Sequence, residues 1–260
     1  MDIVVCVKRV PLTEEVDIII DDKKKEIKKE QLAFVLNDWD NYAIEEAILL
    51  KEKHGGTVTA ITVGNEDDEE VLRRSLAMGA DKAIRIEAGD LTRFDSLSIS
   101  KILSAALKDL SYDLVFTGVL ADDDSSGAVG IMMAELLDLN HSAMVTAIDI
   151  KDGKAGTTSE LEGGLGEASL IDMPALLTIQ TGINEPRYVS ILGIRKAAKK
   201  ELKVIGLDEL GLPEEELAPK TIIEEVYLPP ETEGAQILSG DPGKIASDFV
   251  EILTRKGVME

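Results

Sequence analysis

The chain has 260 residues, of which 28 are basic and 50 acidic, so its formal net charge is −22. The length suffices for one large domain with an appendage, and the negative charge argues against nucleic-acid binding, because phosphates would be repelled. The single cysteine, Cys6, excludes an internal disulfide. The two histidines, His54 and His141, have no partner at metal-ligand spacing, so we expect no metal site.

The sequence contains no candidate membrane segment. No apolar run approaches the roughly 18 residues that a bilayer-spanning helix requires. Met1-Asp2 leads directly into a strand-like run and not into a signal peptide. With the lone cysteine, this predicts a soluble protein of the cytoplasm.

Through residue 139, strand-like apolar runs alternate with helical patterns. The connections are too short for anything but parallel crossovers, which predicts an α/β fold with a parallel sheet and helices on both faces. Asn37 or Asp38 can cap the first helix, and Gly55-Gly56 can end it. The expected strands are 3–7, 58–63, 83–86 and 114–117, the expected helices are 39–50, 67–78, 94–110 and 129–137, and a small surface hairpin is expected over 16–20 and 26–29.

The loop between the strand at 114–117 and the following helix is the most informative stretch. Ser125 and Ser126 are N-cap candidates, and Gly127 lets backbone approach a ligand closely. Unpaired N–H groups at the positive end of a helix dipole bind phosphate. The strict G-x-G-x-x-G and Walker patterns are both absent, so glycines that serve only turns and packing remain an alternative.

Several loops should meet this one. In a doubly wound sheet the crevice at the carboxyl ends of the strands is the usual ligand site. The loops expected there are 8–13, 64–66 and 118–126, with 37–40 beside them. We therefore expect one binding crevice built from these loops.

After residue 140 the pattern changes to short strand-like pieces separated by glycine turns. We expect antiparallel additions to the sheet edge over 144–150, 154–161 and 168–171, followed by an apolar strand at 176–181.

The C-terminal part should form an extended arm with a terminal helix. Residues 206–235 are acidic and contain several prolines, so they can bury little apolar area by themselves. The helix would begin with Asp241 and Pro242. An apolar helix face after an arm suggests docking on another chain, while packing on its own domain remains the alternative. That face consists of Ile245, Phe249, Ile252 and Leu253.

Several motifs, in order along nearly the whole chain, resemble the smaller (beta) subunit of electron transfer flavoprotein. The segment NEPRY is the most specific of them. The matching segments are 5–11 (VCVKRVP), 45–47 (EEA), 76–81 (LAMGAD), 118–130, 161–164 (LEGG), 184–188 (NEPRY) with 196–197, and 237–242 (ILSGDP).

The resemblance implies a heterodimer in which the larger (alpha) subunit carries most of the site for a redox-active FAD. The smaller subunit would hold an adenine nucleotide, usually AMP, in a Rossmann-like domain. Flavin-bifurcating members hold a second FAD there instead. The implied role is that of an electron carrier without substrate turnover of its own. It would pass electrons from flavin-dependent dehydrogenases, of the acyl-CoA dehydrogenase type, to an acceptor such as a quinone oxidoreductase.

The same resemblance divides the chain and assigns the nucleotide site. Residues 1–183 would form the nucleotide-binding domain, and 184–260 the partner-recognition loop and an arm that wraps the larger subunit. The hydroxyls of Ser125 and Ser126 would support the phosphate. The family positions that line the nucleotide fall on Cys6, Lys8, Asn37, Trp39, Asp40, Val63, Ala121, Asp124, Gly127, Ala128 and Val129.

Two departures from the family pattern bear on the cofactor. Nucleotide-holding members carry Asn-Gln-Thr where this chain has residues 127–129 (GAV), so phosphate would be held mostly by backbone N–H groups. The bifurcating pattern Asp-Gly-Asp-Thr would need Gly at Asp124 and Asp at Ser125. AMP is therefore favoured over a second FAD.

The resemblance also implies a docking element for partner dehydrogenases. Residues 191–195 (ILGIR) stand where the family commonly has Leu-Pro-Asn-Ile-Met, which puts the usual acyl-CoA dehydrogenase partner in question. Large aliphatics beside a glycine and cations fit an exposed loop that enters a helix, and a buried strand is the alternative. The expected docking residues are Asn184, Glu185, Pro186, Arg187, Tyr188, Ile191, Leu192, Gly193, Ile194 and Arg195.

Two other functions compete with electron transfer. A stand-alone adenine-nucleotide sensor would fold its arm back on its own domain. An NAD-dependent dehydrogenase is disfavoured, because Lys8-Arg9-Val10-Pro11 follows the first strand where a glycine fingerprint would stand. No nucleophile can be paired with His54 or His141, so nothing indicates hydrolysis or group transfer.

Overall fold

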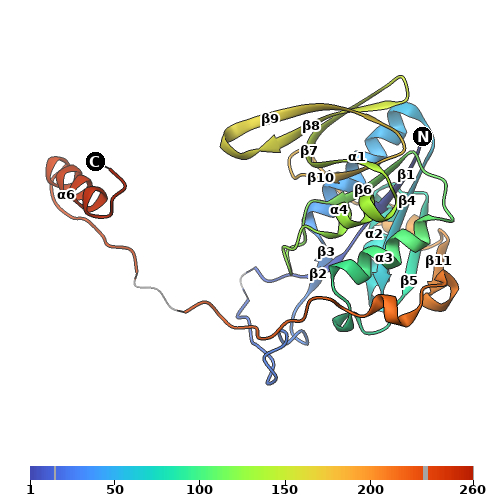
Figure 1. The fold of residues 1–260 in the computed structure, drawn as a ribbon, viewed down its shortest axis with the longest axis horizontal. Coiled ribbons are helices and arrows are strands. Elements are labelled where there is room, and N and C mark those ends of the chain that lie inside the picture. The colour runs from blue at the N-terminus through green and yellow to red at the C-terminus, as the bar shows by residue number, and fades with distance from the viewer. Residues whose placement is uncertain (15, 231–233, 260) are drawn as a thin grey trace.

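A mostly parallel sheet organises the chain. The computed structural model describes residues 1–14, 16–230 and 234–259. Within them, nine strands form one sheet in the order β11-β5-β4-β1-β6-β10-β7-β8-β9 (Figure 1). The strands are β1 Asp2–Cys6, β4 Thr57–Gly64, β5 Lys82–Glu87, β6 Leu114–Gly118, β7 Asn140–Lys151, β8 Lys154–Leu161, β9 Leu165–Asp172, β10 Ala175–Ile179 and β11 Leu202–Gly206.

Strand β1 is central because its apolar run is buried on both faces. It pairs in parallel with β4 and with β6. Ile3 and Val5 pack with the helices α1 and α2, whereas Val4 and Cys6 pack with α3 and α4 on the other face. Alternate residues of a strand point to opposite faces, so one short run serves both layers. The helices are α1 Asp38–His54, α2 Glu69–Met78, α3 Ser96–Leu107, α4 Val129–Leu136, α5 Ile191–Ala197 and α6 Pro242–Arg255.

The structure confirms the expected α/β fold and most element positions. Asn37 occupies the N-cap position of α1, and Gly55 ends that helix. The antiparallel additions are β8 and β9, which extend the sheet beyond β7.

One local expectation was wrong, and another is confirmed only in part. Ser125 and Ser126 do not cap α4, since the N-cap position is occupied by Ala128 without a side-chain bond. The expected hairpin over 16–29 is a single isolated bridge between Ile20 and Ile27. The small antiparallel pair in this region consists instead of β2 Arg9–Pro11 and β3 Phe34–Leu36.

The α/β part extends beyond the expected boundary at residue 183. Strand β11 pairs in parallel with the edge strand β5, and Leu217 is buried in the core cluster beneath α3. Parallel strands need a crossover, and here 180–201, including α5, provides it. We call residues 1–14 and 16–217 the body and residues 218–230 and 234–259 the arm.

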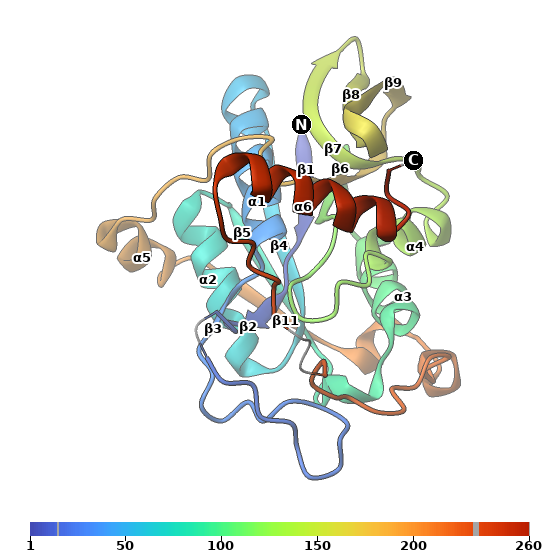
Figure 2. The same cartoon turned by 90° about the vertical axis from the view of Figure 1, so that its left-hand side faces the viewer.

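The arm leaves the body at the start of α3. The N–H groups of Lys220 and Thr221 donate to Asp95 at 2.6 and 3.0 Å. Lys25 Nζ then donates to the carbonyl oxygens of Ile223 and Glu224 at 2.9 and 2.6 Å. The terminal helix α6 stands clear of the body (Figure 1), and Figure 2 shows it in front of the sheet's midline. Among the helices that the structure describes, none is long and apolar enough to cross a bilayer.

Candidate functional site

Asp40 links the ends of two neighbouring strands. Its carboxylate accepts from the N–H of Lys8, just after β1, at 2.8 Å, and from the N–H of Gly118, the last residue of β6, at 3.0 Å. Burial raises the pKa of Asp40 to about 7, although the hydrogen bonds act in the opposite direction. The first turn of α1 therefore holds the carboxyl ends of β1 and β6 together.

Asn37 fixes the loop that follows β6. Its amide Nδ2 donates to the carbonyl oxygen of Leu120 at 2.9 Å, and its Oδ1 accepts from the N–H of Asp122 at 3.1 Å. Its own N–H donates to the carbonyl oxygen of Lys8 at 3.0 Å. Since Asn37 is almost completely buried, its contacts join three of the four loops that the sequence had predicted to meet.

Lys8 is the cation of this site. Its Nζ lies 2.6 Å from Asp123 Oδ1 and 2.9 Å from Asp124 Oδ2. Burial alone would lower the pKa of Lys8, but these two carboxylates outweigh it and the pKa is raised. The N–H of Ser126 donates to Asp124 at 2.9 Å, so the ion pairs also shape the turn before α4.

The N-terminus of α4 carries donors without a side-chain cap. Ala128 at the N-cap position offers no side-chain acceptor to the first N–H groups of the helix. Ser125 and Gly127 both have left-handed backbone, with φ of 49° and 58°. A β-carbon at Gly127 would lie 3.4 Å from the carbonyl oxygen of Val119. This bend directs the backbone into a helix start of the kind that holds phosphate.

The donor set fits a phosphate group. Backbone N–H groups at the start of α4, the hydroxyls of Ser125 and Ser126 and the ammonium of Lys8 are the donors that phosphate prefers. Ser126 Oγ also accepts from Ser96 Oγ at 3.2 Å. The carboxylates of Asp123 and Asp124 oppose an anion, and Lys8 neutralises part of that charge.

The remaining predicted site residues lie in the core or in the loops around this meeting point. Cys6 is buried, and burial raises the pKa of its thiol, so it serves as packing and not as a reactive group. Val63 packs against the same core cluster. Ala121 accepts from the N–H of Ser125 at 2.8 Å through its carbonyl oxygen. Val129 accepts from Ser100 Oγ at 3.2 Å.

Trp39 contacts Gln180, a residue that was not predicted from the sequence to belong to the site. Its indole N–H donates to Gln180 Oε1 at 2.9 Å, and Gln180 Nε2 donates to Glu160 at 3.0 Å. Gln180 directly follows β10, the strand beside β6. Its place at the carboxyl end of a neighbouring strand was the available signal. Asp122 and Asp123, which contact Asn37 and Lys8, were also missed.

The expected docking residues separate into two groups. Tyr188, Ile191, Leu192 and Ile194 are exposed, with 55–92% of their surface accessible. Asn184 and Arg187 are half-buried and contact α1. The segment 191–195 is the beginning of α5 and not a loop. In the described part of the chain, no group of three or more His, Cys, Asp or Glu side chains could hold a metal ion.

A mostly parallel sheet, helices on both faces and loops that meet at the carboxyl ends of β1 and β6 define an α/β protein of the Rossmann-like class. Comparison with known proteins narrows this class. A family model described as "Electron transfer flavoprotein domain" matches residues 26–210. The chain is 43% identical, over 97% of both chains, to the electron transfer flavoprotein subunit beta of Bacillus subtilis. It is 32% identical, over the full length of both, to the caffeyl-CoA reductase-Etf complex subunit CarD of Acetobacterium woodii.

The chain belongs to the electron transfer flavoprotein family, and its similarity covers nearly the whole length of the beta subunits. This confirms the resemblance seen in the sequence motifs. The family assigns the chain to flavoprotein-dependent electron transport.

Proposed function

We propose that this chain is the small subunit of a heterodimeric electron transfer flavoprotein and that it holds one AMP, while the larger subunit carries the redox-active FAD. The observation that carries the proposal is the uncapped N-terminus of α4 beside Lys8, at the meeting point of β1 and β6. The AMP phosphate would bind the N–H groups around residues 125–129, with the adenine near Cys6 and Asn37. In this arrangement AMP is structural, and the chain turns over no substrate of its own.

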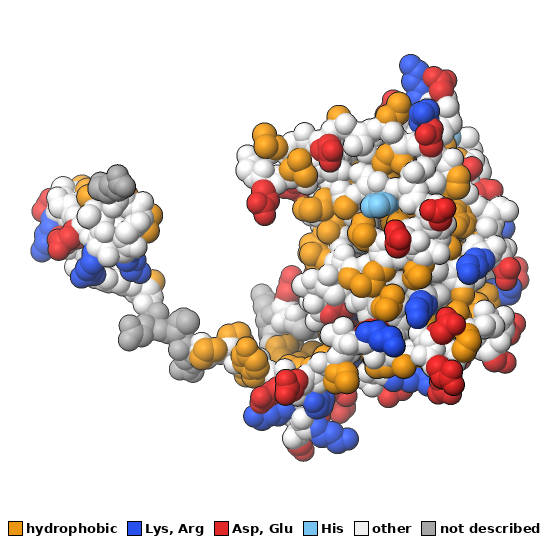
Figure 3. Space-filling view, in the orientation of Figure 1, with side chains coloured by type: hydrophobic (Ala, Val, Ile, Leu, Met, Phe, Trp, Pro, Cys, Tyr) orange, Lys and Arg blue, Asp and Glu red, His pale blue; other side chains and the backbone are white. Residues whose placement is uncertain are grey.

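The arm and the shape of the body support a heterodimer. The body is hollowed on the side that faces α6, below the β7–β9 extension, and hydrophobic side chains line the hollow (Figure 3). Ile222, Tyr227 and Ile237 in the arm are 72–87% exposed. Exposed apolar surface of this extent marks a protein interface. The larger subunit would fill the hollow and be wrapped by the arm.

The exposed aliphatics of α5 would receive the electron donor. Ile191, Leu192 and Ile194 lie beside Arg195 and Lys196. An apolar centre supplies affinity and a charged rim steers the encounter. The donor would be a flavin-dependent dehydrogenase of the acyl-CoA dehydrogenase type, and the acceptor a quinone oxidoreductase, in the cytoplasm or at its boundary.

Counting cofactors tests the proposal. The purified two-subunit complex is denatured by heat, and the released nucleotides are separated by chromatography. One FAD and one AMP per heterodimer are expected. Two FAD and no AMP per heterodimer would refute the AMP assignment and would indicate a flavin-bifurcating complex instead. A chain that purifies alone with bound nucleotide, and does not bind the larger subunit, would instead indicate a stand-alone sensor.

A further inference from the structure

Helix α5 is anchored to the body from its upstream side by one arginine. Arg187 Nε lies 2.9 Å from Glu45 Oε2, and its Nη1 lies 2.8 Å from Glu52 Oε1. The N–H of Arg187 also donates to Glu45 at 3.1 Å. Glu45 and Glu52 are two helical turns apart on α1 and so share one face. Hydrogen bonds to Glu52 and Glu45 raise the pKa of Arg187.

A second contact, three residues earlier, strengthens this anchor. Asn184 Nδ2 donates to Glu46 Oε2 at 2.9 Å and to the carbonyl oxygen of Tyr42 at 3.2 Å. Glu45 and Glu46 are both nearly buried. A buried carboxylate requires a partner, so these two side chains tie residues 184–187 firmly to α1.

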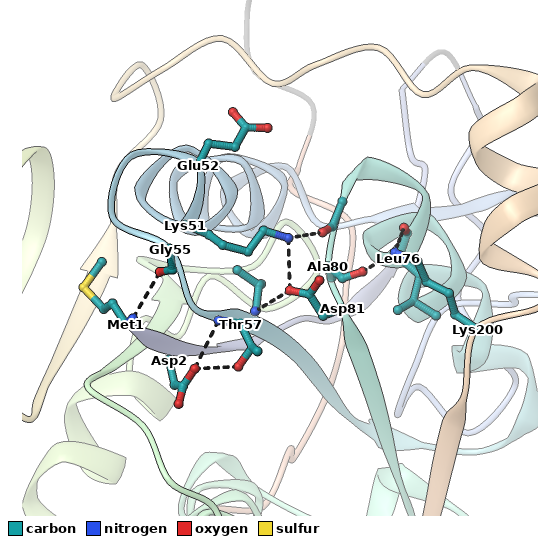
Figure 4. Close-up of polar contacts among 12 residues, drawn as sticks. Met1, Asp2, Lys51, Glu52, Gly55, Thr57, Leu76, Ala80, Asp81 and Lys200 are labelled. Carbon is teal, nitrogen blue, oxygen red and sulfur yellow. Dashed lines mark hydrogen bonds and ion pairs between the residues drawn. The ribbon is translucent and has the colours of Figure 1, made fainter.

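The downstream side of α5 is anchored to α2. Arg73 Nη1 donates to the carbonyl oxygens of Ala197 and Lys200 at 3.1 and 2.9 Å. Lys200 Nζ donates in return to the carbonyl oxygens of Leu76 and Ala80 at 3.1 and 2.5 Å (Figure 4). Leu76 lies in the last turn of α2, where a helix leaves carbonyl groups without intrahelical partners, so the bond to Leu76 also satisfies the end of α2.

Close backbone packing completes the attachment. A β-carbon at Gly193 would lie 3.1 Å from the carbonyl oxygen of Ala77 in α2. The glycine therefore lets α5 approach α2 closely, and Figure 2 shows α5 beside α2 at the margin of the molecule. The buried side chain of Ala197 contributes to the same contact.

The same helix exposes its large apolar side chains. Ile191, Leu192 and Ile194 are 71, 60 and 55% exposed. A helix of seven residues does not stay folded by its own hydrogen bonds. It is ordered here because polar contacts on both sides hold it, and those contacts leave its apolar side chains free.

We propose that Glu45, Arg187 and Arg73 form a clamp that orders α5 in advance for docking of the electron donor. The proposal rests on the proposed function of α5 as the docking element and adds the residues that position it. They bind the segments beside α5 to α1 and α2 and would not contact the donor, so they are positioning residues. Ordering a segment before binding removes that entropic cost from the binding step. The donor surface that fits is an apolar pocket rimmed by carboxylates, because the exposed cations Arg195, Lys196 and Lys199 follow the aliphatics directly along the chain.

The experiment compares four variants of the purified heterodimer. Glu45→Gln removes one charge of the clamp with little change in shape. Arg73→Ala removes the hydrogen bonds to the carbonyl oxygens of Ala197 and Lys200 on the other side of α5. Ile191→Ala removes a docking contact without touching the clamp. Glu201→Gln changes the net charge equally just beyond α5, at an exposed residue, and is the matched control. The donor is a dehydrogenase that reduces the parent complex, with a bacterial acyl-CoA dehydrogenase and butyryl-CoA as the first choice.

Two readouts are measured on each variant. Amide hydrogen exchange over 184–200 reports order in α5, and steady-state flavin reduction gives KM for the donor separately from kcat. Glu45→Gln and Arg73→Ala should speed exchange at least tenfold and raise KM about fivefold, with kcat unchanged. Ile191→Ala should raise KM about tenfold with exchange as in the parent. Glu201→Gln should change neither quantity.

Each contrary result has its own meaning. Parental exchange in both Glu45→Gln and Arg73→Ala would overturn the clamp. Faster exchange with an unchanged KM in these two variants, while Ile191→Ala raises KM, would show that order in α5 is not needed for docking. An unchanged KM in Ile191→Ala would refute the docking function itself, independently of the clamp.

Discussion

The body and the arm differ in the exposure of their apolar side chains. In the body, Val5, Leu72 and Phe116 are fully buried. In the arm, Ile222 and Ile237 are 80 and 87% exposed. Burial of apolar area is the main favourable term in folding, so the body is stabilised within this chain, whereas the arm has yet to bury its apolar surface. The body should therefore respond to single substitutions, and the arm to the presence of its partner.

The largest effect is expected from removing the end of the arm. Deleting residues 236–260 should abolish co-purification with the larger subunit, because the deletion removes the apolar side chains of α6, among them Phe249. Co-expression followed by size-exclusion chromatography measures the loss.

Two single substitutions in α6 test whether its apolar side chains hold the complex together. Phe249→Ser should weaken the complex, whereas Glu251→Ser, on an exposed polar residue of the same helix, should leave it intact. A truncated chain that still forms a stable flavin-containing complex would show that α6 is not the anchor, and that the contrast between body and arm has another cause.

The second prediction concerns the nucleotide site of the body. Gly127→Val should remove most of the bound nucleotide and leave the redox flavin in place. A β-branched side chain at φ of 58° is strained, and it would occupy the approach to the α4 N-terminus. Nucleotide released by heat, quantified against protein, measures the effect.

Gly153 supplies a matched control for backbone strain. Its φ is 77°, and a β-carbon there would meet nothing within 4 Å. Gly153→Val therefore carries comparable strain in the hairpin between β7 and β8, away from the site. Equal nucleotide loss in both variants would attribute the loss to general destabilisation and remove the evidence for a phosphate site at Gly127.

The difference between body and arm also explains what the sequence could predict. Local patterns sufficed for Asn37 at the cap of α1 and for the loops at the strand ends, because capping and periodicity are encoded over a few residues. Strand β11 was missed because its pairing with β5 joins segments more than a hundred residues apart. Ala128 at the α4 cap was missed because the left-handed bend at Ser125 and Gly127 displaced the helix start past both serines.

Side-chain contacts between distant segments were equally out of reach of sequence patterns. The motifs at 45–47 and 184–188 both stand out in the sequence, yet nothing local indicates that Arg187 contacts Glu45. Gln180 lies at a strand end, which was a signal for the site, but its contact with Trp39 depends on β10 lying next to β6 and is not indicated locally. Such contacts follow from the three-dimensional fold and not from spacing along the chain.

The third prediction concerns the pH dependence of the body. The pKa of Asp40 is raised from 3.8 to about 7 by burial, so the folded state holds the proton more tightly than the unfolded state. Below pH 3.8 this group contributes no difference in stability. As the pH rises from about 4 to 7 the folded state loses stability, on the order of 2–4 kcal/mol, and above pH 7 the loss is constant.

Asp40→Asn should remove this dependence, and thermal melting of the heterodimer between pH 4.5 and 8 measures it. The variant should melt below the parent at pH 5, because one amide oxygen replaces two acceptors for the N–H groups of Lys8 and Gly118. The difference should shrink as the pH rises. Asp38→Asn, on the less buried neighbouring residue, should shift the curve much less. Parallel curves for Asp40→Asn and the parent would contradict the assignment.

The smallest effect is expected at Asp95, the point where body and arm meet. This one carboxylate caps α3 through the N–H of Ser98 at 2.9 Å and also accepts from Lys220 and Thr221 of the arm. These hydrogen bonds outweigh the effect of burial and lower the pKa of Asp95 to about 2. Its contribution is present above pH 3.8 and is lost as the pH falls through about 2.

Asp95→Ala should cost about 1–2 kcal/mol, the usual range for a lost N-cap with one further contact, and should speed amide exchange over 218–226. Asp90→Ala is the matched control, because Asp90 caps the short turn at Leu91–Arg93 through Thr92 and has no hydrogen bond to the described arm. It should lower stability by a similar amount without changing exchange in the arm. If Asp90→Ala loosened the arm as much as Asp95→Ala, the arm would depend on the whole α3 region, and the division between body and arm at residue 217 would have to move.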